Sequence, residues 1–311
     1  MPSPRPGAGP SLRDRLGAST FVLTAELDPP RGPDLSRAVQ RAKRLAGVVD
    51  AVNFTDGSLA KVRCSGIAAA AVIQRETGLE TIAHVTCRDR NIIALQADLL
   101  GAAALGIRNV LVLGGDPPTQ GDHPEAKAVY DVDPTGLVRL AGSLNAGRTG
   151  AGSDLDGHTD LMIGCAANPG AADLSKEIEK LAARREAGAS FSQTQPVFDA
   201  DKVLRFQAAV AESGIDMPIL YGLLPLRGVE AARRFDKIPG MGVPPHVVQR
   251  LERAGPEGEE AEGLRIAAEV AAQLAPHVRG LHIFPMGRTQ TVLTIAAALG
   301  RRPVDAAEAK V

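Results

Sequence analysis

The chain has 311 residues, of which 44% are hydrophobic and 23% are charged, enough to bury the core of one large or two smaller globular domains. Its formal net charge is −1 and the charges are interspersed, which argues against a polyanionic partner such as nucleic acid or an anionic membrane. Trp is absent, Tyr and Phe are scarce, and no apolar run reaches the about 18 residues of a membrane helix.

The start of the chain is rich in Pro and Gly, so residues 1–14 are expected to form a disordered tail without the apolar segment of a signal peptide. Residues 302–311 are expected to form a second tail. The three cysteines form no CxxC pair, and the six histidines show no metal-ligand spacing. We therefore expect reduced thiols in a cytoplasmic protein, and no metal site.

Between the tails, eight short apolar runs alternate with longer segments of helical periodicity. The runs that we predict as strands are 20–27, 49–55, 80–86, 108–114, 160–166, 189–195, 217–223 and 279–285. In 89–106 apolar residues recur every three or four positions, and Asp173 and Asp199 stand where each can cap the helix that follows. Eight βα units in residues 15–301 predict the α/β class and a single (β/α)8 TIM barrel.

Two segments interrupt this rhythm. Residues 145–160 are a Gly/Asp-rich insertion before the fifth strand, and we expect them at the N-terminal face of the barrel, away from the chemistry. Residues 239–276 hold more helical sequence than one crossover needs. We therefore predict an extra helix near the C-terminal third of the chain, followed by the usual one.

Polar residues stand at or just beyond the C-terminal ends of the predicted strands, where barrels of this kind hold their active sites. They are Glu26, Thr55, His84, Asp116, Cys165, Asn168, Gln195 and His282. Glu26 ends an apolar run and is followed by Pro29 and Pro30, which prevent further regular pairing and fix the exit of the chain. This placement favours a carboxylate delivered into a pocket; the alternative is one that only pairs with a nearby arginine.

The other polar positions have structural alternatives as well. His84, between apolar neighbours, can be a hydrogen-bonded core histidine, and the GGDPP loop at 114–118 can be a tight turn rather than a ligand cradle. Gln193 and Gln195 share a strand face at period two, and either a ligand or the neighbouring strands can satisfy them. Arg288 can hold an anion or cap a helix.

Together these stretches resemble the methylenetetrahydrofolate reductase family of flavoprotein barrels over about residues 15–300. The segments that carry the resemblance are TAELDPPRG (24–32), AHVTC (83–87), VLGGDPP (112–118), EAGASFSQTQPVFD (186–199), PILYGLLPL (218–226) and GLHIFPMGR (280–288). The chain is more similar to the reductase half of bacterial homocysteine methyltransferase/reductase fusions than to the stand-alone form. The resemblance implies an enzyme of one-carbon metabolism and methionine biosynthesis. Such an enzyme uses FAD and NADH or NADPH to reduce 5,10-methylenetetrahydrofolate to 5-methyltetrahydrofolate.

The resemblance also implies roles for individual residues. Glu26 is the general acid, Asp116 lies beside flavin and folate, and Gln195, Phe235 and Arg288 face folate or the nicotinamide. The positions implied in flavin binding are Thr55, His84, Gly114, Gly115, Asp116, Cys165, Asn168 and Arg184, the last at the flavin phosphates. An acid is needed because the folate ring opens by releasing an amine that must take a proton, and a carboxyl with a raised pKa supplies it.

Four positions depart from the family pattern. Gly114 replaces an Arg, Gly164 a Tyr, Asn168 a His and Ala231 a Gln. The set that anchors flavin is therefore thinned, while the catalytic set is complete. Two alternatives follow from this. One is a reductase of the same folate that holds flavin weakly or takes hydride directly from NADH, and the other is a barrel subunit without catalytic activity.

Overall fold

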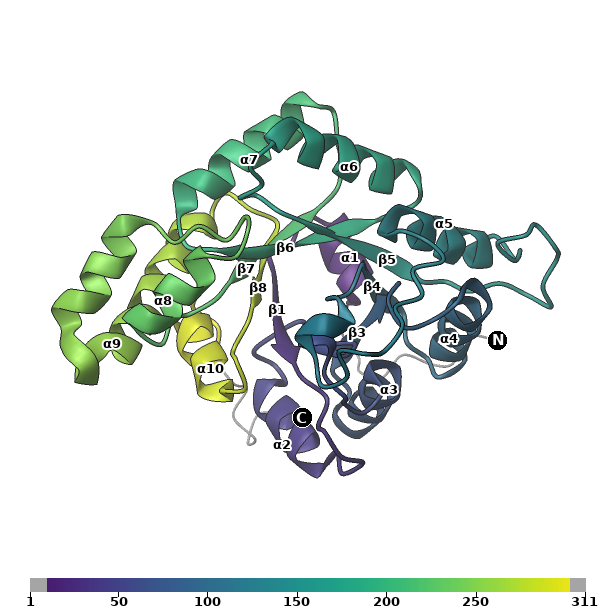
Figure 1. Ribbon diagram of the computed structural model, residues 1–311, viewed down its shortest axis with the longest axis horizontal. Helices are drawn as coiled ribbons and strands as arrows, with labels where there is room; N and C mark the ends of the chain where they lie inside the picture. The colour runs from purple at the N-terminus through teal and green to yellow at the C-terminus, as the bar shows by residue number, and fades with distance from the viewer. Residues whose placement is uncertain (1–9, 303–311) are drawn as a thin grey trace.

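The computed structural model describes residues 10–302, which form a closed barrel of eight parallel strands paired in chain order (Figure 1). The strands are β1 (Val22–Leu27), β2 (Ala51–Phe54), β3 (Glu80–Thr86), β4 (Asn109–Leu113), β5 (Met162–Ala167), β6 (Phe191–Val197), β7 (Ile219–Leu223) and β8 (Gly280–Ile283). Each predicted run overlaps one of them, with β5 and β6 ending one and two residues later than predicted, so the predicted TIM barrel is confirmed. The outer parts of both predicted tails, 1–9 and 303–311, lie outside the described residues.

Helices follow the strands and cover the outside of the barrel. They are α2 (Ser36–Leu45), α3 (Gly66–Thr77), α4 (Ile92–Ala104), α5 (Pro134–Asn145), α6 (Leu174–Glu186), α7 (Ala200–Glu212), α8 (Val229–Asp236), α9 (Pro245–Leu274) and α10 (Thr289–Ala298). The predicted caps are confirmed, because the carboxylates of Asp173 and Asp199 accept hydrogen bonds from backbone N–H groups at the starts of α6 and α7. No helix within residues 10–302 is long and apolar enough to cross a membrane.

Side chains alternate between the two faces of each strand, and this alternation divides the interior. Outward-facing residues such as Leu23, Val52 and Val85 pack with the helices into one continuous apolar shell. Inward-facing residues near the strand starts, such as Ile82 and Phe191, form a separate apolar cluster. The lumen is therefore sealed at its N-terminal end, and the side chains that face the mouth are those near the strand ends.

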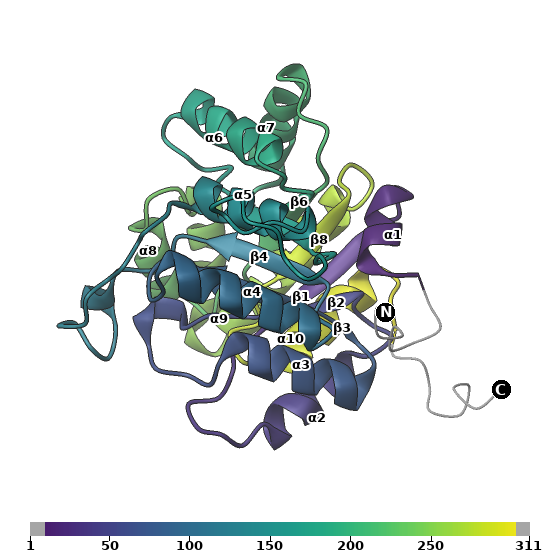
Figure 2. The same ribbon diagram turned by 90° about the vertical axis from the view of Figure 1, so that its right-hand side faces the viewer.

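A short helix corrects the prediction of a disordered tail at the last residues of that tail, 12–14. Helix α1 (Leu12–Gly17) begins at Ser11, whose side chain accepts a hydrogen bond from the Asp14 N–H while the Asp14 carboxylate accepts one from the Ser11 N–H. Leu12 and Leu16 are buried in the cluster at the strand starts. Figure 2 shows α1 at one end of the barrel. The apolar pair of α1 closes this end, so the helix is part of the fold.

The extra helical segment lies between β7 and β8, as predicted. Helix α9 bends at Gly255, where φ is 68°, so its two halves correspond to the two predicted helices. Helix α8 is a further helix that the sequence did not indicate. Both α8 and α9 pack on residues that follow β6 and β7, including Phe198 and Leu224, in a third apolar cluster. These helices therefore stand beside the strand ends on one side of the barrel.

The Gly/Asp-rich insertion lies at the end of the barrel that α1 closes. Asp160, at its end, pairs with Arg13 of α1 at 2.6 Å and with Arg108, just before β4, at 3.2 Å. The expectation that residues 145–160 lie at the N-terminal face is confirmed.

Candidate active site

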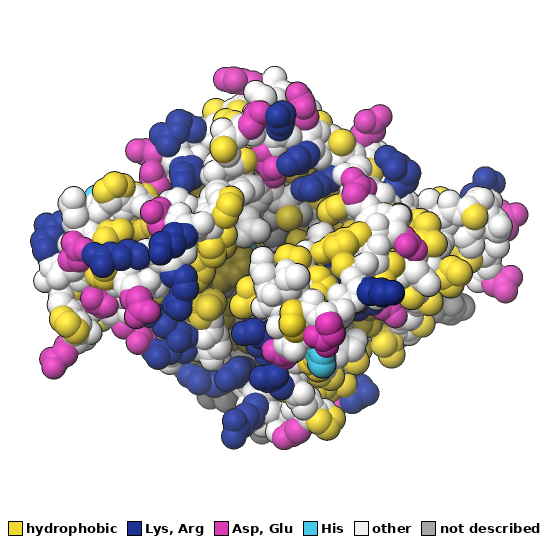
Figure 3. Space-filling view, viewed as in Figure 1, with side chains coloured by type: hydrophobic (Ala, Val, Ile, Leu, Met, Phe, Trp, Pro, Cys, Tyr) yellow, Lys and Arg dark blue, Asp and Glu magenta, His cyan; other side chains and the backbone are white. Residues whose placement is uncertain are grey.

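The open end of the barrel is where the C-terminal ends of the strands meet. Figure 3 shows a hollow in the middle of the face seen in Figure 1, with apolar side chains in its wall and Lys and Arg side chains along its lower rim. Within residues 10–302, no group of three His, Cys, Asp or Glu side chains is arranged to hold a metal ion. The chemistry of this mouth therefore rests on individual polar side chains.

Glu26 stands at the end of β1, half-buried in this mouth, and is the register partner of Asn53 on β2. No N–H or O–H of residues 10–302 donates a hydrogen bond to its carboxyl group. Burial raises the pKa of Glu26 to about 8, with a further contribution from the negative charge of Asp28, while the positive charge of Arg63 acts in the opposite direction. At neutral pH the carboxyl group is therefore protonated and can donate a proton.

The turn that follows β1 holds Asp28 and Arg63 close to Glu26. Asp28 accepts hydrogen bonds from the hydroxyls of Thr55 at 2.8 Å and Ser58 at 3.1 Å. Arg63 donates from Nη1 to the Pro29 carbonyl at 3.0 Å, and its buried Nε has no partner within residues 10–302. Thr55 thus lies in the mouth, where the sequence predicts it, but its hydroxyl is engaged by Asp28.

A layer of buried polar side chains crosses the lumen next to Glu26. Its members are Thr24, Asn53, His84, Gln193 and His282. Burial lowers the pKa of His84 to about 4 and that of His282 to about 3, so both imidazoles are neutral at physiological pH. His84 was predicted as a site residue, and its Nε2 accepts a hydrogen bond from Asn53 at 2.9 Å. The layer forms a polar, uncharged floor.

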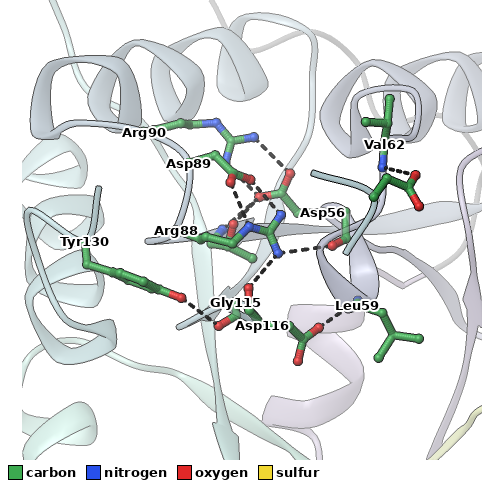
Figure 4. A network of polar contacts seen from close by, with 12 residues as sticks. Asp56, Leu59, Val62, Arg88, Asp89, Arg90, Gly115, Asp116 and Tyr130 are labelled. Atoms are coloured by element: carbon green, nitrogen blue, oxygen red, sulfur yellow. Dashed lines mark hydrogen bonds and ion pairs between the residues drawn. The ribbon is translucent and has the colours of Figure 1, made fainter. Parts of the chain in front are cut away.

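Asp116 lies in the loop after β4, and its carboxylate bridges to the loop after β2. Asp116 Oδ2 accepts a hydrogen bond of 2.7 Å from the backbone N–H of Leu59, in the short helix η1 (Ser58–Ala60) (Figure 4). The buried Arg88 donates to the carbonyl oxygens of Gly57 at 3.2 Å and Asp116 at 3.3 Å. Two predicted site loops are thus tied together by an arginine that the sequence analysis did not single out.

Gly115 lies where this hydrogen-bond network is most closely packed, and its position admits only glycine. Its φ is +90°, and a Cβ atom there would lie 2.9 Å from Cβ of Arg88 and 3.1 Å from Cβ of Thr86. Asp56, in the loop after β2, fixes Thr86: its carboxylate accepts hydrogen bonds from the N–H and the hydroxyl of Thr86 and pairs with Arg90 at 2.7 Å (Figure 4). The GGDPP loop therefore keeps its shape through close packing as well as through turn chemistry.

Tyr130 is a mouth residue that the sequence analysis missed. Its hydroxyl donates to the Gly115 carbonyl at 3.2 Å, its φ is +47°, and 42% of its surface is exposed (Figure 4). Strained backbone of this kind clusters at functional sites, and here it holds an exposed ring beside the Gly115 turn. The available signal was its rarity, since the chain has only two tyrosines and this one follows the GGDPP loop.

The residues predicted around β5 divide between two faces. Strand alternation turns Cys165 outward into the apolar shell, where burial raises the pKa of its thiol to about 11. This thiol does not reach the mouth, contrary to its expected place in the cofactor site.

Arg184 reaches from α6 to the end of β5 and donates from Nη1 to the Ala166 carbonyl at 2.7 Å, while its buried Nε has no partner within residues 10–302. Asn168 lies in the loop after β5, packed against Gly240.

Three residues expected to face folate or nicotinamide lie around the mouth in different settings. Gln195 is exposed at a break in the β6–β7 register, whereas Gln193 points into the lumen and is buried. Phe235 is partly buried against the α8–α9 cluster, and Arg288 pairs with Glu260 of α9. Gln195 is thus free to meet a ligand, while Phe235 and Arg288 already have partners in the protein.

The two glycines that depart from the family pattern differ in the space around them. A Cβ on Gly164 would lie 2.4 Å from the ring of Phe191, so the inward-pointing phenyl ring already fills this part of the lumen. A Cβ on Gly114 would meet only Cγ of Pro134, at 3.8 Å. A side chain fits at Gly114 and does not fit at Gly164.

A model of the family described as methylenetetrahydrofolate reductase matches residues 11–300. The 5,10-methylenetetrahydrofolate reductase of Pectobacterium carotovorum subsp. carotovorum is 26% identical over 292 residues, which cover 90% of this chain and 91% of the relative. The 5,10-methylenetetrahydrofolate reductase of Escherichia coli (strain K12) is 26% identical over 310 residues, covering 94% and 97%. A probable methylenetetrahydrofolate reductase (NADPH) of Caenorhabditis elegans is 26% identical over 294 residues, which span only 42% of that protein.

Among solved structures, an uncharacterized protein from Clostridium thermocellum that binds two copies of 5-methyl-5,6,7,8-tetrahydrofolic acid has a TM-score of 0.65. It is 12% identical in sequence, and the match covers 92% of this chain and 96% of that one. A 2,3-dimethylmalate lyase matches with a TM-score of 0.51 at 12% identity, covering 93% and 82%. At these identities the likeness shows the barrel fold alone.

The charge of Arg63 gives a direct test of the electrostatics of the mouth. Arg63→Gln removes the cation that favours the Glu26 carboxylate, so the pKa of Glu26 should rise further, by the order of one unit. Arg63→Lys keeps the charge and should stay close to the wild type. The infrared C=O stretch of a protonated carboxyl, assigned by its loss in Glu26→Gln, reports the pKa when followed against pH. A midpoint that stays in place or falls in Arg63→Gln contradicts this role of Arg63.

Proposed function

Because this chain belongs to the methylenetetrahydrofolate reductase family, we propose that it is a flavin-dependent NAD(P)H reductase of 5,10-methylenetetrahydrofolate in which Glu26 is the general acid. The product is 5-methyltetrahydrofolate. The observation that carries the proposal is the protonated Glu26 carboxyl, with a pKa of about 8, at the end of β1 in the mouth. We further propose a cytoplasmic location, with which the three free thiols agree.

The proposed chemistry needs a proton at one place. 5,10-Methylenetetrahydrofolate must open its five-membered ring before it accepts hydride, and the departing nitrogen takes a proton as it leaves. A protonated carboxyl with a pKa near the working pH is suited to give it. Asp28 and the neutral floor support this role of Glu26, because Asp28 favours the protonated form and the two buried histidines add no positive charge to the lumen.

The residues around the mouth fit a flavin, which supplies the hydride-transfer chemistry when bound. Arg184 presents an unpartnered, buried Nε–H beside the end of β5, as a group that receives a phosphate would. Tyr130 offers an exposed ring next to Gly115. We propose that these residues, with Thr55, His84, Gly114, Asn168 and the Asp116 loop, hold FAD. Asp116 is proposed to act beside the reacting rings, and Gln195, Phe235 and Arg288 to contact folate or the nicotinamide.

A second candidate is a reductase of the same folate that holds flavin weakly or takes hydride directly from NADH. The observation that favours it is the open space at Gly114, where the chain presents no cation and no side chain. The third candidate, a barrel without catalytic activity, has less support because Glu26 keeps the burial and the proton that an acid needs.

The acid is tested by Glu26→Gln, which keeps the size of the side chain but cannot act as an acid. The variant should still consume NADH in reducing the flavin at close to the wild-type rate, because that half-reaction needs no acid. Transfer to 5,10-methylenetetrahydrofolate should slow by roughly 10²–10⁴-fold while folate still binds. Stopped-flow absorbance resolves the two half-reactions. Normal folate reduction in the variant would make Glu26 structural, and failure of both half-reactions would make it a residue that holds the pocket together.

The two candidate functions are separated by Gly114→Arg, which the free space permits. A cation beside the cofactor phosphates adds charge-assisted hydrogen bonds, so the dissociation constant for FAD should fall by about 10-fold or more. Fluorescence titration of wild type and variant with FAD measures this, and Gly164→Ala serves as a contrast, since its Cβ would meet Phe191 and lower the melting temperature. If wild type and Gly114→Arg bind FAD equally tightly, another residue already supplies the cation and the weak-flavin candidate loses its support.

A further inference from the structure

Two amides pair across the lumen next to Glu26. Asn53 on β2 and Gln193 on β6 belong to strands that stand four apart, and therefore opposite each other, in the closed barrel. Asn53 Nδ2 donates to Gln193 Oε1 at 2.6 Å, and Gln193 Nε2 donates to Asn53 Oδ1 at 3.4 Å. Such a reciprocal pair satisfies the buried amides at the centre of the barrel.

The remaining amide hydrogens are also used. The second hydrogen of Asn53 Nδ2 goes to His84 Nε2 at 2.9 Å, and that of Gln193 Nε2 goes to Thr24 Oγ1 at 3.3 Å. Because the Thr24 hydroxyl accepts from Gln193, its own hydrogen is free to donate to His282 Nδ1, 2.8 Å away. Both histidines then act as acceptors in these bonds, as neutral imidazoles do.

Glu26 stands beside this layer and receives nothing from it. It is the register partner of Asn53, and it follows Thr24 by two residues, so its side chain points into the same lumen. Asn53 has the nearest amide in the strand register, yet both of its hydrogens are directed elsewhere. A hydrogen bond donated to the carboxylate would favour its ionised form, and the pairing of Asn53 with Gln193 withholds that bond.

The other groups that face Glu26 do not replace the missing donor. Asp28, in the turn that follows β1, is negative, and Arg63 from the loop after β2 acts through its charge, with no hydrogen bond to the carboxyl group. His84 on β3 and His282 on β8 are neutral. Of the floor's amides, that of Asn53 is the one in register with Glu26, and it is held by Gln193.

We propose that Gln193 is a positioning residue for the acid: it holds the Asn53 amide across the lumen and so leaves the Glu26 carboxyl without a donor until substrate arrives. The inference deepens the proposed function, on which its kinetic test rests. Its spectroscopic test rests only on the protonation of Glu26. Within this layer the amide hydrogens of Asn53 and Gln193 and the hydroxyl of Thr24 all have partners.

The test is Gln193→Met, which keeps the side-chain volume but removes the acceptor and frees one Asn53 hydrogen to turn toward Glu26. The pH midpoint at which the C=O band of the protonated Glu26 carboxyl disappears, assigned by difference from Glu26→Gln and here called the infrared midpoint, should fall by about one pH unit. The alkaline limb of 5,10-methylenetetrahydrofolate reduction should move to lower pH by the same amount. Melting curves establish that the variant is folded, and Gln193→Leu provides the same test if Gln193→Met is not.

Two matched variants separate positioning from a general disturbance of the floor. Thr24→Val removes a polar contact in the same layer but leaves both Asn53 hydrogens engaged, so the infrared midpoint should stay at the wild-type value. In the double variant Asn53→Leu/Gln193→Met no amide remains, and the midpoint should return to the wild-type value or above it. An unchanged midpoint in folded Gln193→Met, or equal midpoints in the single and double variants, overturns the proposal. A shifted midpoint with an unmoved alkaline limb upholds the positioning role and instead rejects Glu26 as the acid of the reaction.

Discussion

The desolvation of one carboxyl group, that of Glu26, is the constraint on which the rest of this structure depends. A carboxyl in water would be ionised at neutral pH, and this one holds its proton to a pKa of about 8 because it ends a buried strand beside Asp28. Keeping water away from this carboxyl group requires a lumen that is closed at its N-terminal end, and the apolar cluster at the strand starts and helix α1 close it. It also requires neighbours that are polar enough to be buried together yet offer the carboxyl group no hydrogen bond.

The mouth combines this desolvated acid with loops that are firmly held. Asp116 and Arg88 join the loops after β2, β3 and β4 through backbone N–H and carbonyl groups, which leaves few ways for the loops to move independently. On the β5 side, Arg184 brings a positive charge to the strand end with one N–H unused. The mouth thus combines an uncharged floor and a protonated carboxyl with a cation beside the end of β5.

The barrel and the position of Glu26 were predictable from the sequence because both follow from local patterns. Apolar runs alternating with helical periods predict the barrel, and a carboxylate before a Pro-Pro exit predicts Glu26 at a strand end. Cys165 was misplaced because a position near a strand end does not say which face its side chain takes, and one step of alternation separates lumen from shell. The capping box of Ser11 and Asp14 was present in the sequence, but the Pro/Gly-rich composition around it obscured a helix of six residues.

Other features could not have been predicted, since they arise from residues far apart in the chain. Asn53 and Gln193 meet only when the barrel closes, 140 positions apart in sequence, and each alone looks like a polar residue inside a strand. The same holds for Phe191, whose ring occupies the space over Gly164. Arg88 and Tyr130 needed the fold to show that they converge on Gly115.

The central claim is that the Glu26 proton is the one delivered to the folate. The most direct measurement is the single-turnover rate of 5,10-methylenetetrahydrofolate reduction by wild-type protein across neutral and alkaline pH. The acid form predominates below its pKa, so the rate should be constant at neutral pH and fall with a midpoint of about 8. A rate that passes through pH about 8 unchanged, or one that has already fallen with a midpoint near the ordinary glutamate pKa of about 4.3, would contradict it.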